Sequence, residues 1–133
     1  MITRNQEHEL IMISIYDALI YSEMDEAFSL EDVMEGVYML QYSEIPFFSR
    51  EVVIKSLANI NDIKAIYQKN MPKWNFDRLN ALERAILLMS YTHSKLEETA
   101  DKKVIIDVAI RLAKKYLDKD DYKFVNAILD KTL

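Results

Sequence analysis

Residues that form tight turns are scarce in this chain of 133 residues, and their scarcity limits the folds open to it. There is one glycine, Gly36, and there are two prolines, Pro46 and Pro72. A β-sandwich or β-barrel needs many tight turns, which depend on such residues. Half of the chain is hydrophobic, which is enough for one compact core, but the length is too short for two ordinary domains. We therefore expect one all-α domain, spanning residues 1–133, built from long helices.

The apolar positions recur with helical spacing and predict about seven helices. The first covers residues 6–21 and is apolar on nearly every side, which is typical of a helix at the centre of a bundle. A second buried helix runs from residue 80 or 81 to about His93, followed by a charged loop over residues 94–101. The other helices are expected to begin at the capping residues Ser29 and Ser49, at residues 61–62, at residue 102 and at residues 120–121.

The chain lacks the residue patterns of common catalytic sites. It has no cysteine, which excludes disulfides, thiolate metal sites and a cysteine nucleophile. Its two histidines, His8 near the N-terminus and His93, do not have the spacing of metal ligands. A phosphate-binding loop needs several glycines, and only Gly36 is present. We therefore expect neither an enzyme, nor a metal site, nor a cofactor.

The charge is distributed unevenly along the chain. Residues 1–51 contain 11 acidic and 2 basic residues, whereas residues 52–133 contain 11 acidic and 15 basic residues. A polyanion would therefore favour the C-terminal part, although the same charges could serve only to solvate helix surfaces. The apolar runs are short and interrupted, so we expect no membrane-spanning helix and no signal peptide, and hence a cytoplasmic protein.

Three motifs in the last sixty residues carry a resemblance to a known family. They are the segment Lys73-Trp74-Asn75-Phe76-Asp77-Arg78-Leu79-Asn80-Ala81-Leu82-Glu83-Arg84-Ala85-Ile86-Leu87, the segment 104–114 with Asp107, Ala109 and Leu112-Ala113-Lys114, and the segment Lys123-Phe124-Val125-Asn126-Ala127-Ile128-Leu129-Asp130. In their order and spacing they resemble the NusB family of bacterial transcription antitermination factors. The resemblance is firm over residues 73–133 and weaker over residues 1–72.

The resemblance implies a fold and a function. The fold is all-helical, with two small bundles, approximately residues 1–72 and 73–133, that share the first helix. The function is transcription antitermination: family members bind boxA RNA of ribosomal transcripts together with NusE, a ribosomal protein of the small subunit, within the RNA polymerase antitermination complex. Basic residues at the start of the first helix contact the RNA in that family.

The candidate site residues fall into an RNA-binding set and a partner-binding set. A basic face is expected on the last two helices and their connecting loop, formed by Lys102, Lys103, Lys114, Lys115, Lys119 and Lys123. The RNA-binding candidates are Arg4, His8, Lys102, Lys103, Lys119, Lys123, Phe124 and Asn126. The partner-binding candidates are Tyr16, Asp107, Val108 and Arg111. Phe124 and Tyr16 are alternatively core residues, and Asn126 is alternatively a helix cap.

The chain departs from the family pattern at its functional positions. The arginine-rich N-terminal run of the family is replaced by residues 4–9, in which Arg4 is the one certain positive charge, and this loss predicts a lower RNA affinity and a weaker salt dependence. Val108 stands where the family has a glutamate that engages NusE. The alternatives are a helical protein-interaction module that has lost RNA binding, and a relative of the NusB-like domain that precedes ribosomal RNA methyltransferases. The sequence does not decide whether the protein forms a homodimer.

Overall fold

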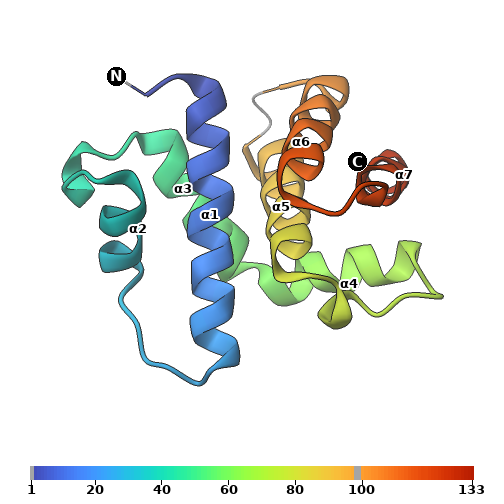
Figure 1. The fold of residues 1–133 in the computed structure, drawn as a ribbon, viewed down its shortest axis with the longest axis horizontal. Coiled ribbons are helices and arrows are strands. Elements are labelled where there is room, and N and C mark those ends of the chain that lie inside the picture. The colour runs from blue at the N-terminus through green and yellow to red at the C-terminus, as the bar shows by residue number, and fades with distance from the viewer. Residues whose placement is uncertain (1, 98–99) are drawn as a thin grey trace.

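The computed structural model describes residues 2–97 and 100–133, and these residues contain seven α-helices and no strand. The helices are α1 (Arg4–Glu23), α2 (Leu30–Tyr38), α3 (Phe47–Ala58), α4 (Ile60–Asn70), α5 (Ala81–Tyr91), α6 (Lys102–Tyr116) and α7 (Asp121–Thr132) (Figure 1). The prediction of an all-α fold with about seven helices is confirmed. None of the helices in the described residues combines the length and the apolar character that crossing a membrane requires.

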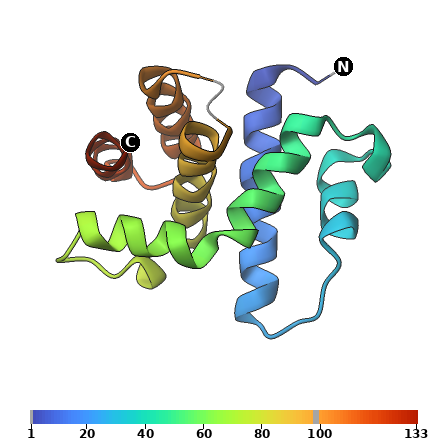
Figure 2. The same ribbon diagram turned by 180° about the vertical axis from the view of Figure 1, so that it is seen from behind.

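The helix α1 lies between two groups of helices. It packs against α2 and α3 on one side and against α5 on the other, as both ribbon views show (Figures 1 and 2). Its side chains Ile11, Met12 and Ile15 are fully buried. A helix that is apolar on most of its sides needs neighbours on most of its sides, and here it has them. The first helix is therefore shared by the two groups.

The helix α5 is the second buried element. Each residue from Glu83 to Ser90 is buried, and the helix packs against α1, α3, α4 and α6. Tyr67 of α4 is fully buried and donates a hydrogen bond of 2.6 Å from its hydroxyl to the Leu87 carbonyl oxygen. Leu88 is likewise fully buried. These contacts fix the orientation of α5 and of the segment that leads into it.

The helix α4 belongs with the C-terminal group, although it precedes the division expected after residue 72. It packs against α7 and α5, and within the N-terminal group its contacts are with α3. One residue, Asn59, joins α3 to α4: its backbone N–H donates to the Lys55 carbonyl oxygen, and its own carbonyl oxygen accepts from the Ile63 N–H. The structure therefore places the change of group at this residue.

Two helix starts follow their capping residues and one does not. The Ser29 hydroxyl accepts a hydrogen bond from the Asp32 N–H, as expected for the cap of α2. Thr3 and Gln6 form a capping box, so α1 begins at Arg4, earlier than expected. By contrast, α3 begins at Phe47 after Pro46, and Ser49 is not its cap. The prediction for Ser49 was wrong because its hydroxyl has a partner that is distant in sequence.

The first part of the loop expected over residues 94–101 is helical. A π-helical segment, Thr92–Glu97, continues α5 without a break, while residues 98 and 99 lie outside the described part. The segment is tied to α3 by a hydrogen bond of 2.8 Å between the Ser56 and Thr92 hydroxyls and by an ion pair of 2.7 Å between Lys55 and Glu97. These tertiary contacts stabilise a helical extension in a charged stretch that favours a loop by composition.

The buried Ser49 hydroxyl gives a test of this correction. It donates a hydrogen bond of 2.7 Å to the Oε2 atom of Glu7, which is itself buried. We expect Ser49→Ala to lower the free energy of unfolding by about 1–3 kcal/mol, because a buried acceptor loses its donor. Ser49→Asp is expected to be more damaging still, because it places two carboxylates together in a buried site.

Urea unfolding of both variants measures these effects. A helix cap accepts Asp as readily as Ser. A Ser49→Asp variant as stable as the parent would therefore contradict the buried-donor assignment.

Candidate nucleic-acid interface

Two of the predicted lysines meet α7 at the start of α6. Lys102 and Lys103 line a hollow of about 570 Å³ together with Asp107 of α6 and with Asn126 and Asp130 of α7. The Lys102 ammonium group donates to the Asp130 carbonyl oxygen at 2.7 Å and lies 3.6 Å from its carboxylate. Lys103 is exposed and forms no ion pair with the described residues. The structure thus brings together three of the RNA-binding candidates, Lys102, Lys103 and Asn126, with part of the Lys102 charge neutralised.

The remaining candidates on this side of the protein lie around the start of α7. Lys119 is exposed in the connection between α6 and α7. Lys123 is exposed and forms an ion pair of 3.4 Å with Asp120, one turn away. Both positive groups are accessible. Because an exposed ion pair such as Lys123–Asp120 contributes little energy, another anion can readily replace the carboxylate as the partner of Lys123.

Phe124 lies on the side of α7 that faces the connection between α4 and α5. Its half-buried ring is 5.5 Å from the ring of Trp74, measured between centroids, at an interplanar angle of 59°. Trp74, in this connection, is 58% exposed. Lys73, Arg78 and Lys131 are exposed around it. These residues lie outside the predicted RNA-binding set, although their combination of a tryptophan with nearby cations is visible in the sequence.

The candidates on α1 have different environments. Arg4 is exposed, with its guanidinium carbon 4.0 Å above the Phe48 ring and its Nε atom 3.7 Å from Glu7. His8 is 3% exposed and packs against His93, with 5.4 Å between the ring centroids. We expected His8 to be available to RNA, but its side chain points inward from α1, against the Phe48 and His93 rings. In this arrangement Arg4, and not His8, presents a charge to solvent.

The His8 environment disfavours the charged imidazole. Burial, together with the nearby charges of His93, Arg4 and Arg111, lowers the pKa of His8 to about 4. Neither ring nitrogen of His8 has a hydrogen-bond partner among the described residues. Burial also lowers the pKa of His93, with the Arg4 charge adding to the effect. No group of three or more potential metal ligands is assembled in the described part of the chain.

The partner-binding candidates divide by exposure. Asp107 and Arg111 are exposed on α6, Tyr16 is half-buried on α1, and Val108 is 7% exposed in the core. A buried valine offers no polar or accessible group to a partner. The structure thus leaves Asp107, Arg111 and Tyr16 as the accessible members of this set.

The end of α6 is joined to α1 by a charged contact. The Lys115 ammonium group lies 2.8 Å from the Glu9 carboxylate, and the Tyr116 hydroxyl donates to the same carboxylate oxygen. Hydrogen bonds from Lys115 and Tyr116 lower the pKa of Glu9. Lys115 therefore has a carboxylate partner, while Lys114 lies over the Tyr122 ring at 4.7 Å. The six lysines of the expected basic face do not form one continuous free surface.

A buried carboxyl group lies near the start of α7. Glu83 is 7% exposed, and burial, with a smaller contribution from Asp121, raises its pKa to about 7. Its neighbour Arg84 forms an ion pair with Glu23 at the end of α1 and donates to the Leu79 carbonyl oxygen at 3.0 Å. At neutral pH, Glu83 therefore carries only part of a full negative charge.

We expect His8 to lower the stability of the protein as the pH drops from about 6.5 to about 4, because the unfolded chain binds a proton at His8 more tightly than the folded chain does. The folded pKa of about 4 lies below the ordinary value of 6.5. The loss of stability is therefore expected between these two pH values. His8→Phe, which keeps a ring and removes the titrating group, is expected to reduce this pH dependence by about 1–3 kcal/mol. Urea unfolding at several pH values measures it, and an unchanged pH profile in the variant would contradict the buried neutral imidazole.

Glu83 produces a pH dependence of the opposite sign. Its folded pKa of about 7 lies above the ordinary value of 4.5, so its contribution is present at low pH and is lost as the pH rises through 7. We expect Glu83→Gln to be more stable than the parent by about 1–3 kcal/mol at about pH 8, and to show little difference at about pH 5. Glu44→Gln, at an exposed position, is the control. Equal unfolding midpoints for the parent and Glu83→Gln across this range would contradict the assignment.

Comparisons with known proteins give one consistent result. A sequence model described as the NusB family matches residues 19–133. A transcription antitermination protein NusB from Finegoldia magna is 30% identical over 131 residues, covering 98% of this chain and 93% of the relative. Another, from Treponema denticola, is 39% identical over 83 residues, covering 62% of this chain and 61% of the relative.

The solved structures that are similar share the fold. T. maritima NusB superposes with a TM-score of 0.85 at 23% identity, covering 99% of this chain and 92% of that one. A chain in the crystal structure of a plectonemic RNA supercoil superposes with a TM-score of 0.79 at 19% identity, covering 98% of this chain and 94% of that one. The family match extends over most of the sequence and the fold agrees over nearly all of it. On these grounds, this chain belongs to the NusB family.

Proposed function

We propose that this protein is an RNA-binding transcription antitermination factor. The observation that carries the proposal is the joint surface of α6 and α7, where Lys102, Lys103 and Asn126 line one hollow. Lysines supply the electrostatic part of RNA binding, and an asparagine amide both donates and accepts hydrogen bonds at base edges. Membership of the NusB family supports the same role. The proposed role is binding rather than catalysis.

The proposal extends to the molecules that the family resemblance implies. The RNA is of the boxA type, and the protein partner is NusE, within the RNA polymerase antitermination complex. Asp107 and Arg111 are exposed on α6 and are available to a protein partner, as is the half-buried Tyr16. Val108, in the core, contributes to such an interface only by supporting α6. In this role the protein acts in the cytoplasm.

A protein-interaction module without RNA binding is the second candidate function. It is favoured by an apolar hollow of about 500 Å³ between α1 and the end of α2, lined by Ile2, Leu10, Ile13 and Val37 among others. Met39 at its edge is 87% exposed. Exposed apolar surface of this kind is typical of protein interfaces, including that of a homodimer. The RNA titration below separates the two functions.

We expect Lys102→Gln with Lys103→Gln to weaken binding of boxA-type RNA about tenfold at low salt, because two phosphate contacts are lost. The slope of log affinity against log salt is expected to decrease by about 1 to 1.5. Fluorescence anisotropy of labelled RNA at several salt concentrations measures both quantities, with and without NusE.

The matched control is Gln41→Glu with Ser43→Glu. These residues are exposed near the end of α2, on the side of the protein away from α7, and this pair changes the formal charge by the same amount (Figure 1). We expect it to change RNA affinity much less than the lysine pair does. Equal losses of RNA affinity in the two double variants would show that only the net charge matters. If the parent binds no RNA, with or without NusE, the protein-interaction function is the one that remains.

A further inference from the structure

The one tryptophan of the chain, Trp74, is in an unusual environment. Its side chain is 58% exposed, whereas tryptophan is strongly buried on average. It borders two hollows, one of about 370 Å³ against α7 and one of about 490 Å³ against the start of α5. A large aromatic ring left at the surface between two hollows is available to a ligand.

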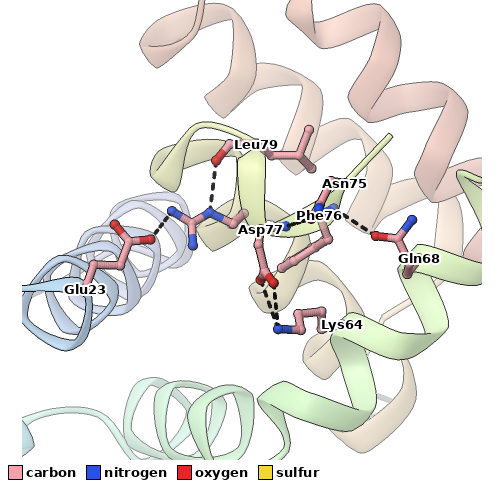
Figure 3. Close-up of polar contacts among 8 residues, drawn as sticks. Glu23, Lys64, Gln68, Asn75, Phe76, Asp77 and Leu79 are labelled. Atoms are coloured by element: carbon pink, nitrogen blue, oxygen red, sulfur yellow. Dashed lines mark hydrogen bonds and ion pairs between the residues drawn. The ribbon is translucent and has the colours of Figure 1, made fainter. Parts of the chain in front are cut away.

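The segment that carries Trp74 is held firmly. Gln68 of α4 donates to the Trp74 carbonyl oxygen at 2.6 Å and accepts from the Phe76 N–H at 2.9 Å. Lys64 binds both carboxylate oxygens of Asp77 at 3.0 Å, and Figure 3 shows these side chains converging on the segment. Phe76 is buried and stacks on Tyr67. The exposure of Trp74 is thus imposed by a fixed backbone, so a ligand would meet a preorganised ring.

The surroundings of Trp74 are aromatic and cationic. The Phe124 ring forms a second aromatic wall of the hollow against α7, and Lys73 and Lys131 line the same hollow. Arg78 lines the other hollow, where Glu83 is the acidic residue. Lys73, Arg78 and Lys131 are exposed and form no ion pair with the described residues. Aromatic faces flanked by free cations complement a base together with its neighbouring phosphates.

We propose that the hollow lined by Trp74 and Phe124 binds an unpaired nucleobase of single-stranded RNA, which stacks on Trp74 while Lys73 and Lys131 contact the adjoining phosphates. This inference rests on the proposed RNA-binding function and adds a second contact to it. The two contacts are on different faces of α7. Asn126 and Asp130 line the hollow shared with α6, whereas Ala127 and Lys131, the next residues along, line the hollow beside Trp74. One strand crossing α7 reaches both.

Because Trp74 is the only tryptophan, its intrinsic fluorescence reports this site alone. We expect a short oligoadenylate to quench the emission, with the same midpoint as its binding measured by anisotropy. An abasic ribose-phosphate oligomer of equal length is expected to bind through the lysines, more weakly and with little quenching. Trp74→Ala should weaken oligoadenylate binding about tenfold, and Trp74→Phe, which keeps an aromatic face, should restore most of it.

The control variant is Phe47→Ala. Phe47 is 67% exposed at the start of α3, outside both hollows, so its loss should leave RNA affinity unchanged. Lys73→Gln with Lys131→Gln should weaken binding of both oligomers and lower the salt slope by about 1 to 1.5. Circular dichroism and urea unfolding of each variant confirm that the fold is intact.

The outcomes separate this inference from the function on which it rests. If the parent binds oligoadenylate and Lys102→Gln with Lys103→Gln weakens it, but Trp74→Ala does not and the emission is unchanged, the Trp74 site is overturned and the proposed function stands. If the parent binds no RNA by anisotropy, both fail. An emission change with NusE and none with RNA would assign Trp74 to a protein interface and overturn the inference.

Discussion

The packing of α1 against α5 is the interaction on which the rest of the structure depends. Both helices are buried along most of their length, with Ile11 and Ile15 of α1 and Ile86 and Leu87 of α5 fully removed from solvent. Because α1 also carries the N-terminal group and α5 carries the C-terminal group, this one contact sets the position of each group relative to the other. The helices α6 and α7 add to the arrangement that this contact between α1 and α5 determines.

Much of the fold follows from the periodicity of apolar residues, and the exceptions share a physical cause. The seven helices and the central position of the first helix could be predicted, because a helix that buries one face or all of its faces has apolar residues at the corresponding positions of its sequence. The role of Ser49 and the helical state of Thr92–Glu97 could not be predicted from the sequence, because both depend on partners that are distant along the chain. The Ser49–Glu7 hydrogen bond joins residues 42 apart, and the Ser56–Thr92 hydrogen bond joins residues 36 apart. Rules for helix caps and composition consider only residues that are close in sequence, so they do not identify such distant partners.

The candidate site was predictable by residue type but not by exposure or pairing. Lys102, Lys103 and Asn126 do share a hollow, as their places at the start of α6 and within α7 suggest. His8 was misplaced because its side chain turns inward against the Phe48 and His93 rings, and the Lys115 charge is matched by Glu9, more than a hundred residues earlier. The exposure of Trp74 escaped prediction for the opposite reason: hydrogen bonds from Gln68 hold the backbone so that the ring stays outside the core.

The junction at Asn59 has a consequence for how length changes are tolerated. Because Asn59 is both the C-cap of α3 and the N-cap of α4, no further residue separates the two helices. Inserting one residue there would shift α4 relative to α3. This shift would displace Gln68 and Lys64, which hold the segment bearing Trp74. A change in chain length between α3 and α4 would thereby reshape a surface that lies in another part of the sequence, whereas the longer connection between α1 and α2 has non-helical residues that can take up such a change.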